Sequence, residues 1–413
     1  MDELFEHDFA VDHFPAACRS IRVACVTETY PPEVNGVSLT VARMVEGLQR
    51  RNHDVQLVRP RQAVQDAARW GDRFHEVLLR GLPIPRYPSL RMGMPSRRAL
   101  VRLWALQRPD VVHIATEGPL GWSALQAARQ LRLPVCSDFR TNFHTYSQMY
   151  GVGWLHKPIM GYLRKFHNRT LCTMVPTEAL RRELASSGFE RLLVLTRGVD
   201  GLQFSPAHRS EALRADWGAG QDTLVVTCVG RLAREKNLDL LVAAFQAIKQ
   251  TVPAARLVLV GAGPLDEELR QRVPDAVFAG QRRGDDLAAH YASADLFLFP
   301  SMSETFGNVT TEALASGLPV VAFAHAAAGQ LITDGVDGVC VPFGDAQAFV
   351  HAAVALAADA DRRERLGRSG RARALELDWD AIVQRFESVL AAAIRQSAAP
   401  GALPAASLLQ RAA

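Results

Sequence analysis

The sequence predicts an α/β protein built from two doubly wound parallel-sheet domains that face each other across a cleft. Short apolar runs of strand length alternate along the chain with segments of helical period, the pattern of a parallel sheet covered by helices. The alternation pauses near residue 198 and starts again near residue 224. With 413 residues, 48% of them hydrophobic and 22% charged, the chain is long enough for two separate cores.

In the first half, each strand-length run is apolar and is bounded by turn residues. The predicted strands are Arg22–Val26, Asp54–Val58, Val111–Ile114, Pro134–Ser137, Thr173–Val175 and Leu192–Leu195. A proline-rich connection, residues 59–95, follows the second of them. Proline lacks a backbone donor, so we expect no regular structure there, and the connection forms either a functional loop or an ordered wrap over the surface.

The same pattern returns in the second half, with helical segments such as Leu238–Gln250 and Asp345–Ala357 between the runs. The predicted strands are Leu224–Val229, Leu257–Val260, Ala276–Ala279, Leu296–Phe299, Val320–Ala322 and Val339–Val341. An amphipathic stretch, Asp378–Ile394, follows the last strand and is expected to form a closing helix. The Ala- and Pro-rich end offers little to bury.

These patterns divide the chain into an extension (1–20), a first domain (21–198), a second domain (199–377), the closing helix (378–395) and a disordered tail (396–413). The linker falls within Gly198–Trp217, which contains Gly201, Pro206 and a polar stretch. We therefore expect a cleft between the domains, with ligands bound near the carboxyl ends of the strands.

Charge and composition predict a cytoplasmic protein. The first residues form no apolar segment of the kind found in secretory signals, and no window is long and apolar enough to span a membrane. Residues 1–200 hold 27 Lys and Arg against 19 Asp and Glu. Such a basic half either attracts an anionic acceptor or the inner face of an anionic membrane, or is a solvated surface. No nucleic-acid partner is expected.

The loop after the first predicted strand has a single glycine before a helix. A nicotinamide or flavin enzyme would carry G-x-G-x-x-G at this turn, whereas the loop Thr27–Val37 has only Gly36. This disfavours an oxidoreductase. One glycine still allows backbone N–H groups to approach a phosphate or sugar, although Asn-Gly is also common in ordinary turns.

The loop that opens the second domain carries two cations. Arg231 and Lys236 lie within Gly230–Asn237, directly after a predicted strand. Arginine offers a rigid fork to phosphate oxygens and lysine a flexible point charge, so the pair is suited to a diphosphate leaving group. Taken alone, the loop could equally be a solvated basic turn.

A second motif in the same domain places two glutamates eight positions apart, Glu304 in a loop and Glu312 about one turn into the following helix. Between them, the N–H groups of Phe306, Gly307 and Asn308 lie at the start of that helix, where anions bind favourably. An isolated pair of glutamates usually caps or solvates a helix. Together with the two upstream cations, the pair indicates a ligand site.

In these motifs the sequence resembles the retaining family-four glycosyltransferases over nearly all of residues 21–395. The resemblance implies the GT-B fold, with two Rossmann-like domains, and transfer of a sugar from a nucleotide-diphosphate donor to an acceptor with retention of configuration. It implies roles for the residues above: Arg231 and Lys236 bind the diphosphate, Glu304 and the backbone of 306–308 hold the sugar, Glu312 holds the ribose and Gly36 approaches the diphosphate from the opposite domain.

Within the family, the chain is most similar to enzymes that glycosylate lipids, such as GDP-mannose-dependent mannosyltransferases and sulfoquinovosyl-diacylglycerol synthases, which have a similar Gly81–Pro95 loop. One position departs from the family pattern. Many relatives have a histidine soon after the fourth strand of the first domain, where this chain has Arg140, and His144 follows one turn later. We expect His144 to take the catalytic role, with Arg140 as the alternative.

No cofactor or essential metal is expected. Asp359-Ala360-Asp361 and Asp378-Trp379-Asp380 imitate metal-binding D-x-D, but both lie away from the predicted strand ends, where solvation or N-capping is the ordinary role of aspartate. The cysteines lack the paired spacing of a zinc site. Gly261–Pro264 is interpreted as a turn, with Pro264 at the first position of a helix.

Several alternatives remain open at this point. An epimerase of the same fold would turn over a nucleotide sugar without an acceptor, and a non-catalytic protein would bind one without turnover. The sequence also leaves the donor open between a GDP-sugar and a UDP-sugar, with base contacts expected near Arg282–Gly284. We expect a hexose, with mannose favoured, and a lipid or glycan acceptor.

Overall fold

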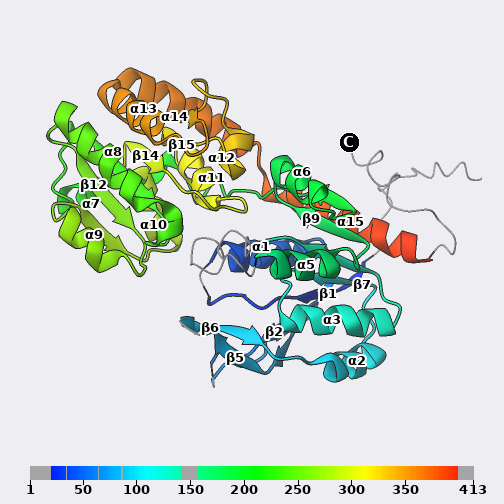
Figure 1. Cartoon of the computed structure of the whole chain (residues 1–413). Helices are drawn as coiled ribbons and strands as arrows, with labels where there is room; N and C mark the ends of the chain where they lie inside the picture. The colour runs from blue at the N-terminus through cyan, green and yellow to red at the C-terminus, as the bar shows by residue number, and fades with distance from the viewer. Residues whose placement is uncertain (1–19, 34, 64, 85–86, 141–155, 399–413) are drawn as a thin grey trace, which may run out of the picture.

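The computed structural model describes residues 20–33, 35–63, 65–84, 87–140 and 156–398, which form two α/β domains. Figure 1 shows the domains beside each other, with the final helix returning from the second domain to the first. The predicted fold class is confirmed, and each predicted strand is present within a residue or two of its expected bounds. The last helix, Trp379–Ala398, continues three residues into the predicted tail (396–413), so the predicted end of the closing helix was too early. The rest of that tail and residues 1–19 of the extension lie outside the described residues.

The first domain is built on an eight-stranded sheet, which is parallel apart from its short last strand. The strands in spatial order are β10 (Leu192–Val194), β9 (Cys172–Val175), β8 (Val135–Asp138), β7 (Val111–Ile114), β1 (Arg22–Val26), β2 (Asp54–Pro60), β4 (Phe74–Leu79) and β3 (Trp70–Gly71). Alternate residues of a strand point to opposite faces, so Val23 and Cys25 join one core cluster while Ala24 and Val26 join another.

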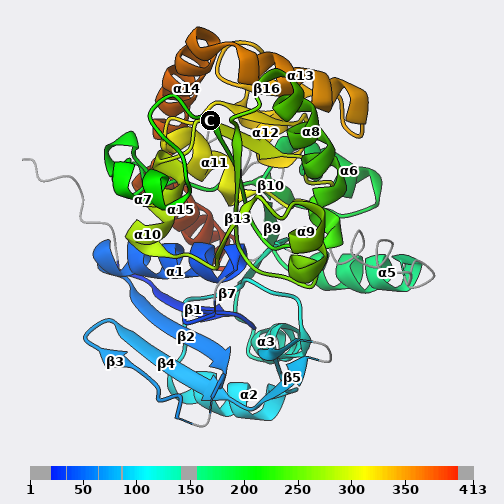
Figure 2. The same cartoon turned by 90° about the vertical axis from the view of Figure 1, so that its left-hand side faces the viewer.

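Helices cover both faces of this sheet. Helices α1 (Gly36–Arg50) and α15 (Trp379–Ala398) pack on the Val23 face, and α2 (Arg97–Leu106), α3 (Pro119–Gln130) and α5 (His156–His167) pack on the other. Helix α6 (Glu178–Ser186) packs beside β9 and β10. Figures 1 and 2 show α1 on the side of the first domain that faces the second.

The expectation of an irregular proline-rich connection was wrong. Residues 59–95 contain β3, β4 and an antiparallel hairpin of β5 (Gly81–Ile84) and β6 (Tyr87–Gly93). A two-stranded hairpin has two free edges, where a proline without an N–H leaves no sheet partner unsatisfied. Pro83 and Pro88 therefore lie within its strands.

The second domain has a six-stranded, wholly parallel sheet. Its strands in spatial order are β13 (Val277–Gly280), β12 (Arg256–Val260), β11 (Val225–Val229), β14 (Leu296–Phe299), β15 (Val320–Phe323) and β16 (Val339–Val341). The helices around it are α8 (Leu238–Thr251), α9 (Asp266–Arg272), α10 (Gly284–Ala292), α11 (Asn308–Ala315), α12 (Ala326–Leu331), α13 (Ala346–Ala358) and α14 (Ala360–Leu375).

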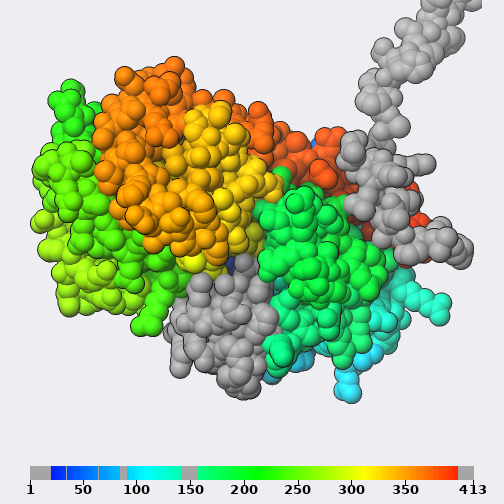
Figure 3. Space-filling model, turned by 45° about the horizontal axis from the view of Figure 1, so that its top comes forward, coloured from blue at the N-terminus to red at the C-terminus, as the bar shows by residue number. Residues whose placement is uncertain are grey.

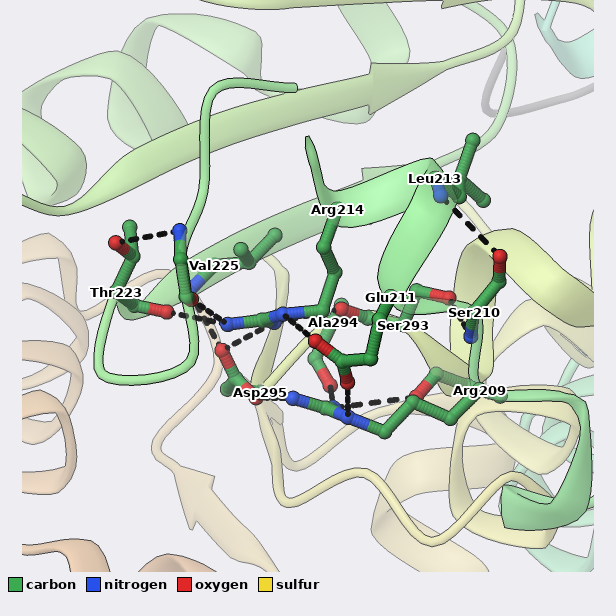
Figure 4. A network of polar contacts seen from close by, with 12 residues as sticks. Arg209, Ser210, Glu211, Leu213, Arg214, Thr223, Val225, Ser293, Ala294 and Asp295 are labelled. Atoms are coloured by element: carbon green, nitrogen blue, oxygen red, sulfur yellow. Dashed lines mark hydrogen bonds and ion pairs between the residues drawn. The ribbon is translucent and has the colours of Figure 1, made fainter. Parts of the chain in front are cut away.

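The segment that leads into the second domain is anchored to it by a buried arginine. Arg214, in α7 (Glu211–Asp216), is fully buried and donates to Asp295 Oδ2 at 2.9 Å and to the carbonyl oxygens of Ser293 at 2.8 Å and Thr223 at 2.7 Å (Figure 4). Asp295 Oδ2 also accepts from the N–H of Val225, the first residue of β11. The later part of the predicted linker is thus fixed to the second-domain sheet.

The two domains contact each other at several points. Arg43 of α1 forms an ion pair with Asp200 at 2.9 Å. The N–H of Glu178, at the start of α6, donates to Gln330 Oε1 of α12 at 3.2 Å, and Figure 3 shows this part of the first domain against the second. Helix α15 begins beside Gly198, where an added Cβ would lie 2.8 Å from the ring of Trp379. The chain therefore crosses between the domains twice at one place.

Candidate active site

Both sheets have a topological switch point, where consecutive crossovers run to opposite sides. In the first domain it lies between β1 and β7, and in the second between β11 and β14. The loops after such a pair of strands diverge and leave a crevice at the carboxyl edge of the sheet, which is where ligands bind in folds of this kind. The loops with Gly36, with Arg231 and Lys236, and with Glu304 are loops of this type.

The loop after β14 leads into the N-terminus of α11. Gly307 has a φ of +92° and turns the chain so that the helix begins at Asn308, which places Glu312 one turn in, as predicted. Phe306 is buried against Ala327 and Leu331, and its carbonyl accepts from the N–H of Ala327 at 2.7 Å. This packing fixes the first N–H groups of α11, which have no partner within the helix and favour an anion. We call this helix N-terminus the anion seat.

The two predicted cations lie beside this seat, because β11 and β14 are adjacent in the sheet. The Lys236 ammonium forms an ion pair with Glu304 Oε1, and the same oxygen accepts from Ser301 Oγ at 2.7 Å. Arg231 Nη1 lies 3.4 Å from Glu235 Oε1, and its side chain is 37% exposed. The structure therefore brings Arg231, Lys236 and Glu304 together at one edge of the second domain.

Glu312 lies deeper, with its carboxylate facing α10. Tyr291 donates its hydroxyl to Glu312 Oε2 at 2.9 Å. Burial raises the pKa of Glu312 to about 7, and the hydrogen bond from Tyr291 opposes part of that rise. A partly buried carboxylate with one oxygen engaged retains acceptor capacity for a hydroxyl group of a ligand.

The first domain reaches this site through Gly36 and Arg197. A Cβ added at Gly36 would lie 3.7 Å from Asn308 Nδ2 and 3.8 Å from Arg197 Nη1. Arg197 Nη1 donates to Asn308 Oδ1 at 3.2 Å, and its guanidinium lies 5.5 Å from the centroid of the Phe306 ring. Gly36 thus faces the anion seat from the opposite domain. Sequence reasoning missed Arg197, whose only signal was its place directly before the linker.

The candidate histidine, His144, lies outside the described residues. Arg140 is buried and forms an ion pair with Asp138, whose Oδ2 also lies 2.8 Å from His113 Nε2. Burial opposes the ionisation of Asp138, but the attraction of Arg140 and His113 outweighs it and lowers the pKa of Asp138 to about 2. Arg140 is therefore held within the first domain by its own carboxylate partner.

Two further carboxylates lie at the carboxyl edge of the first-domain sheet. Glu28, after β1, accepts from the N–H groups of Leu120 at 2.9 Å and Gly93, and burial raises its pKa to about 7. Glu117, after β7, is 2% exposed, and neither of its carboxylate oxygens has a hydrogen-bond partner in the described part of the chain. Burial raises the pKa of Glu117 to about 8. Neither residue belongs to a periodic pattern or a motif that could have identified it from the sequence.

The described residues contain no cluster of three or more His, Cys, Asp or Glu side chains arranged to hold a metal ion. Asp359 of the first D-x-D string caps α14 by accepting from the N–H of Arg362 at 2.8 Å, and Asp378 Oδ1 accepts from the N–H of Asp380 at 3.2 Å. None of the helices in the described ranges is long and apolar enough to cross a bilayer.

Comparison with known protein families divides the chain where the fold does. Residues 34–201 match a family model described as Glycosyltransferase Family 4, and residues 223–359 match one described as Glycosyl transferases group 1. Solved structures with the same fold include a sucrose-phosphate synthase from Thermosynechococcus elongatus, with a TM-score of 0.76 and 20% identity over 92% of this chain and 100% of that one. Anabaena HepE in complex with UDP and glucose has a TM-score of 0.71 and 19% identity, over 90% and 100%.

Curated proteins give a stronger sequence match. A GDP-mannose-dependent alpha-mannosyltransferase of Mycobacterium tuberculosis is 34% identical over 89% of this chain and 97% of its own length. A protein of the same name from Corynebacterium glutamicum is 32% identical over 90% of each chain. Sulfoquinovosyl transferase SQD2 of Arabidopsis thaliana is 31% identical over 75% of this chain and 62% of its own. The chain therefore belongs to the family-four glycosyltransferases.

Proposed function

We propose that this glycosyltransferase moves a hexose, with mannose favoured, from a nucleotide-diphosphate sugar to a hydroxyl of a lipid or lipid-linked glycan, with retention and without a metal. One observation carries the proposal: Lys236, on the same loop as Arg231, pairs with Glu304 directly before the N-terminus of α11, and Gly36 of the other domain faces Asn308 at that terminus. The names of the mannosyltransferase and sulfoquinovosyl transferase relatives support the sugar and acceptor classes.

In this proposal, the donor diphosphate binds between the cations and the first amides of α11. Arg231 supplies a planar fork and Lys236 a point charge. The carboxylate of Glu304 holds the Lys236 ammonium toward the site and accepts from a hydroxyl of the sugar. Two cations and a helix N-terminus supply the charge that a bound divalent ion would otherwise provide.

The chemical step follows from this placement. The bond between the anomeric carbon and the phosphate oxygen breaks, the bond to the acceptor oxygen forms on the same face, and the acceptor proton passes to the departing phosphate oxygen. Negative charge grows on the leaving diphosphate, where Arg231 and Lys236 oppose it. Loss of one such preorganised contact costs roughly 100-fold or more in kcat in other enzymes, and we expect this of Arg231→Ala.

A surface groove on the first domain supports a lipid acceptor and peripheral contact with the inner face of an anionic membrane. The groove has a volume of about 1130 Å³ and lies between α2 and α3. Its lining combines cations with aromatic rings: Arg97, Arg98, Arg102, Trp122 and Tyr162. Leu106, at the end of α2, is 87% exposed. Aromatic, aliphatic and cationic groups on one surface suit a lipid–water interface.

A thermal-shift screen tests the donor assignment. The purified protein is heated with GDP, UDP, GDP-mannose, UDP-glucose and NAD, with Arg231→Ala and Glu312→Ala as matched variants. A ligand bound by the native state raises the Tm, so we expect one nucleoside diphosphate to raise it and both variants to lose the shift. The proposal would be overturned if only NAD raised the Tm, or if none of the nucleotides did.

A turnover assay separates transfer from its rivals. With the donor that shifts the Tm, release of nucleoside diphosphate should require an acceptor, supplied as diacylglycerol or a glycolipid in mixed micelles. Turnover of the nucleotide sugar to its epimer without acceptor would show an epimerase. Binding without any turnover, across lipid and soluble glycan acceptors, would show a binding protein.

A further inference from the structure

Arg197 is a buried cation at the boundary of the two domains. It follows β10, is 5% exposed, and donates from Nη1 at 3.2 Å to the neutral side chain of Asn308. Its Nε is buried and has no hydrogen-bond acceptor among the described residues. Its guanidinium also lies over the Phe306 ring, 5.5 Å from the ring centroid. A neutral amide and an aromatic ring leave most of the guanidinium charge uncompensated.

The other buried arginines are different. The described residues include four buried arginines: Arg59, Arg140, Arg197 and Arg214. Three of them form ion pairs with carboxylates: Arg59 with Asp66, Arg140 with Asp138, and Arg214 with Asp295. Arg197 forms no ion pair in the described part of the chain. Burying a charge without a counterion costs folding free energy, so packing within the protein does not explain an arginine at this position. An anionic ligand that pairs with the guanidinium would explain it.

The residues around Arg197 indicate where an anion could pair with its guanidinium. Asn308 is the first residue of α11, so the guanidinium lies at the anion seat of that helix. Burial and, to a smaller extent, repulsion by Arg140 lower the pKa of Arg197 to about 9, although the attraction of Asp138 and Glu304 opposes part of this fall. The group therefore stays charged at neutral pH, and the space beside it already favours an anion.

We propose that Arg197 is a third donor-binding cation, contributed by the first domain, whose guanidinium binds a terminal oxygen of the donor's distal phosphate at the N-terminus of α11. The inference rests on the proposed function, because it takes the anion to be a nucleoside diphosphate. It adds that the diphosphate is held from both domains: Arg231 and Lys236 from one side, and Arg197 beside Gly36 from the other. Binding of the donor would then draw the two domains together.

A ligand-binding role for Arg197 predicts opposite effects of its removal on stability and on ligand affinity. If Arg197 serves a ligand, Arg197→Gln removes an uncompensated buried charge, so the Tm of the ligand-free protein should stay the same or rise while ligand affinity falls. If Arg197 served packing, the Tm would fall, as it should for Arg214→Gln, the matched variant of a buried arginine that has its carboxylate. Arg197→Lys keeps a positive charge and should recover part of the affinity.

The test is calorimetric titration of the full chain and its variants with nucleoside, nucleoside diphosphate and inorganic pyrophosphate, alongside the Tm without ligand. We expect Arg197→Gln to bind the diphosphate and pyrophosphate roughly 10- to 100-fold more weakly and the nucleoside unchanged, as for a lost hydrogen bond to a charged group. Unchanged diphosphate affinity would overturn the proposal, as would a lower ligand-free Tm with equal losses for nucleoside and diphosphate.

The same titrations keep this inference separate from the proposed function. If the wild type binds the diphosphate and Arg231→Ala weakens it while Arg197→Gln does not, only the role of Arg197 fails. If the wild type binds no nucleoside diphosphate at all, the proposed function fails and the role of Arg197 fails with it.

Discussion

At the residue scale, glycines set the shape of the candidate site. Gly307 has a φ of +92°, and a Cβ there would also lie 3.5 Å from Cγ of Glu304. Gly261 and Gly263 pack so closely on the Arg231 loop that added Cβ atoms would collide with the carbonyls of Gly230 and Leu232. The Gly261 segment therefore supports the loop that carries Arg231 by close backbone contact.

Gly307→Ala tests whether that shape matters for binding. An alanine in the left-handed region costs about 1 kcal/mol of stability, and here the new methyl group would also come into van der Waals contact with Glu304, directly before the N-terminus of α11. We expect a lower Tm together with weaker donor binding. Gly344→Ala is the control, because Gly344 has a φ of +82° with open space around it. Equal donor affinities in the two variants would show that Gly307 shapes the fold alone.

Glu312 predicts a pH dependence. Its folded-state pKa of about 7 lies above its usual value, so its contribution to stability is full below that usual value and is lost as the pH rises through 7. Compared with Glu312→Gln, the wild-type Tm should fall between about pH 5 and pH 8. Ribose hydroxyls donate best to an ionised carboxylate, so nucleotide affinity should rise over pH 6 to 8 in the wild type more than in the variant. Parallel curves for both proteins would contradict this role.

At the element scale, the strands that were predicted correctly are those with continuous apolar runs. β7, with all four residues buried, and β11, with all five, lie inside parallel sheets, where both faces need apolar side chains. β3 to β6 lie at an edge or in a hairpin, contain prolines and charges, and gave no such run. The start of α11 was predictable because a glycine precedes it. The start of α9 was not: it begins at Asp266, so Pro264 lies in the turn and not at the first helical position.

The Arg214 network predicts a large loss of stability. Arg214→Gln removes the guanidinium that pairs with Asp295 and that donates to the carbonyl oxygens of Ser293, Gly220 and Thr223, and breaking a buried pair of this kind costs about 3 kcal/mol. Arg209→Gln is the control, because Arg209 contacts the same carboxylate at 3.1 Å from a side chain that is 36% exposed, where an ion pair is worth at most about 1 kcal/mol. Urea denaturation measures both. Similar losses would mean that the network is no anchor.

At the scale of the whole molecule, the site depends on residues far apart in the chain. Arg197 and Asn308, or Gly36 and Asn308, meet only because two sheets place their switch points opposite each other. Motif spacing identified the loops of the second domain, since those residues lie close together in sequence. It could not identify Glu117 or Arg197, because each matters through buried polar atoms that have no hydrogen-bond partner among the described residues, and burial depends on the finished fold.

The excess of basic residues in the first half predicts how the molecule meets a membrane. Arg97 and Arg98 are exposed beside the α2–α3 groove, and each is worth about 1 kcal/mol near an anionic surface. Arg97→Ala/Arg98→Ala should therefore bind phosphatidylglycerol vesicles roughly 30-fold more weakly at low salt, with unchanged nucleotide affinity. Arg365→Ala/Arg368→Ala, which removes two exposed arginines from α14 of the other domain, should keep its binding. Vesicle sedimentation measures both variants. Equal losses would show that net charge alone drives attachment, and no wild-type binding would remove the membrane from the proposed function and leave a soluble glycan as the acceptor.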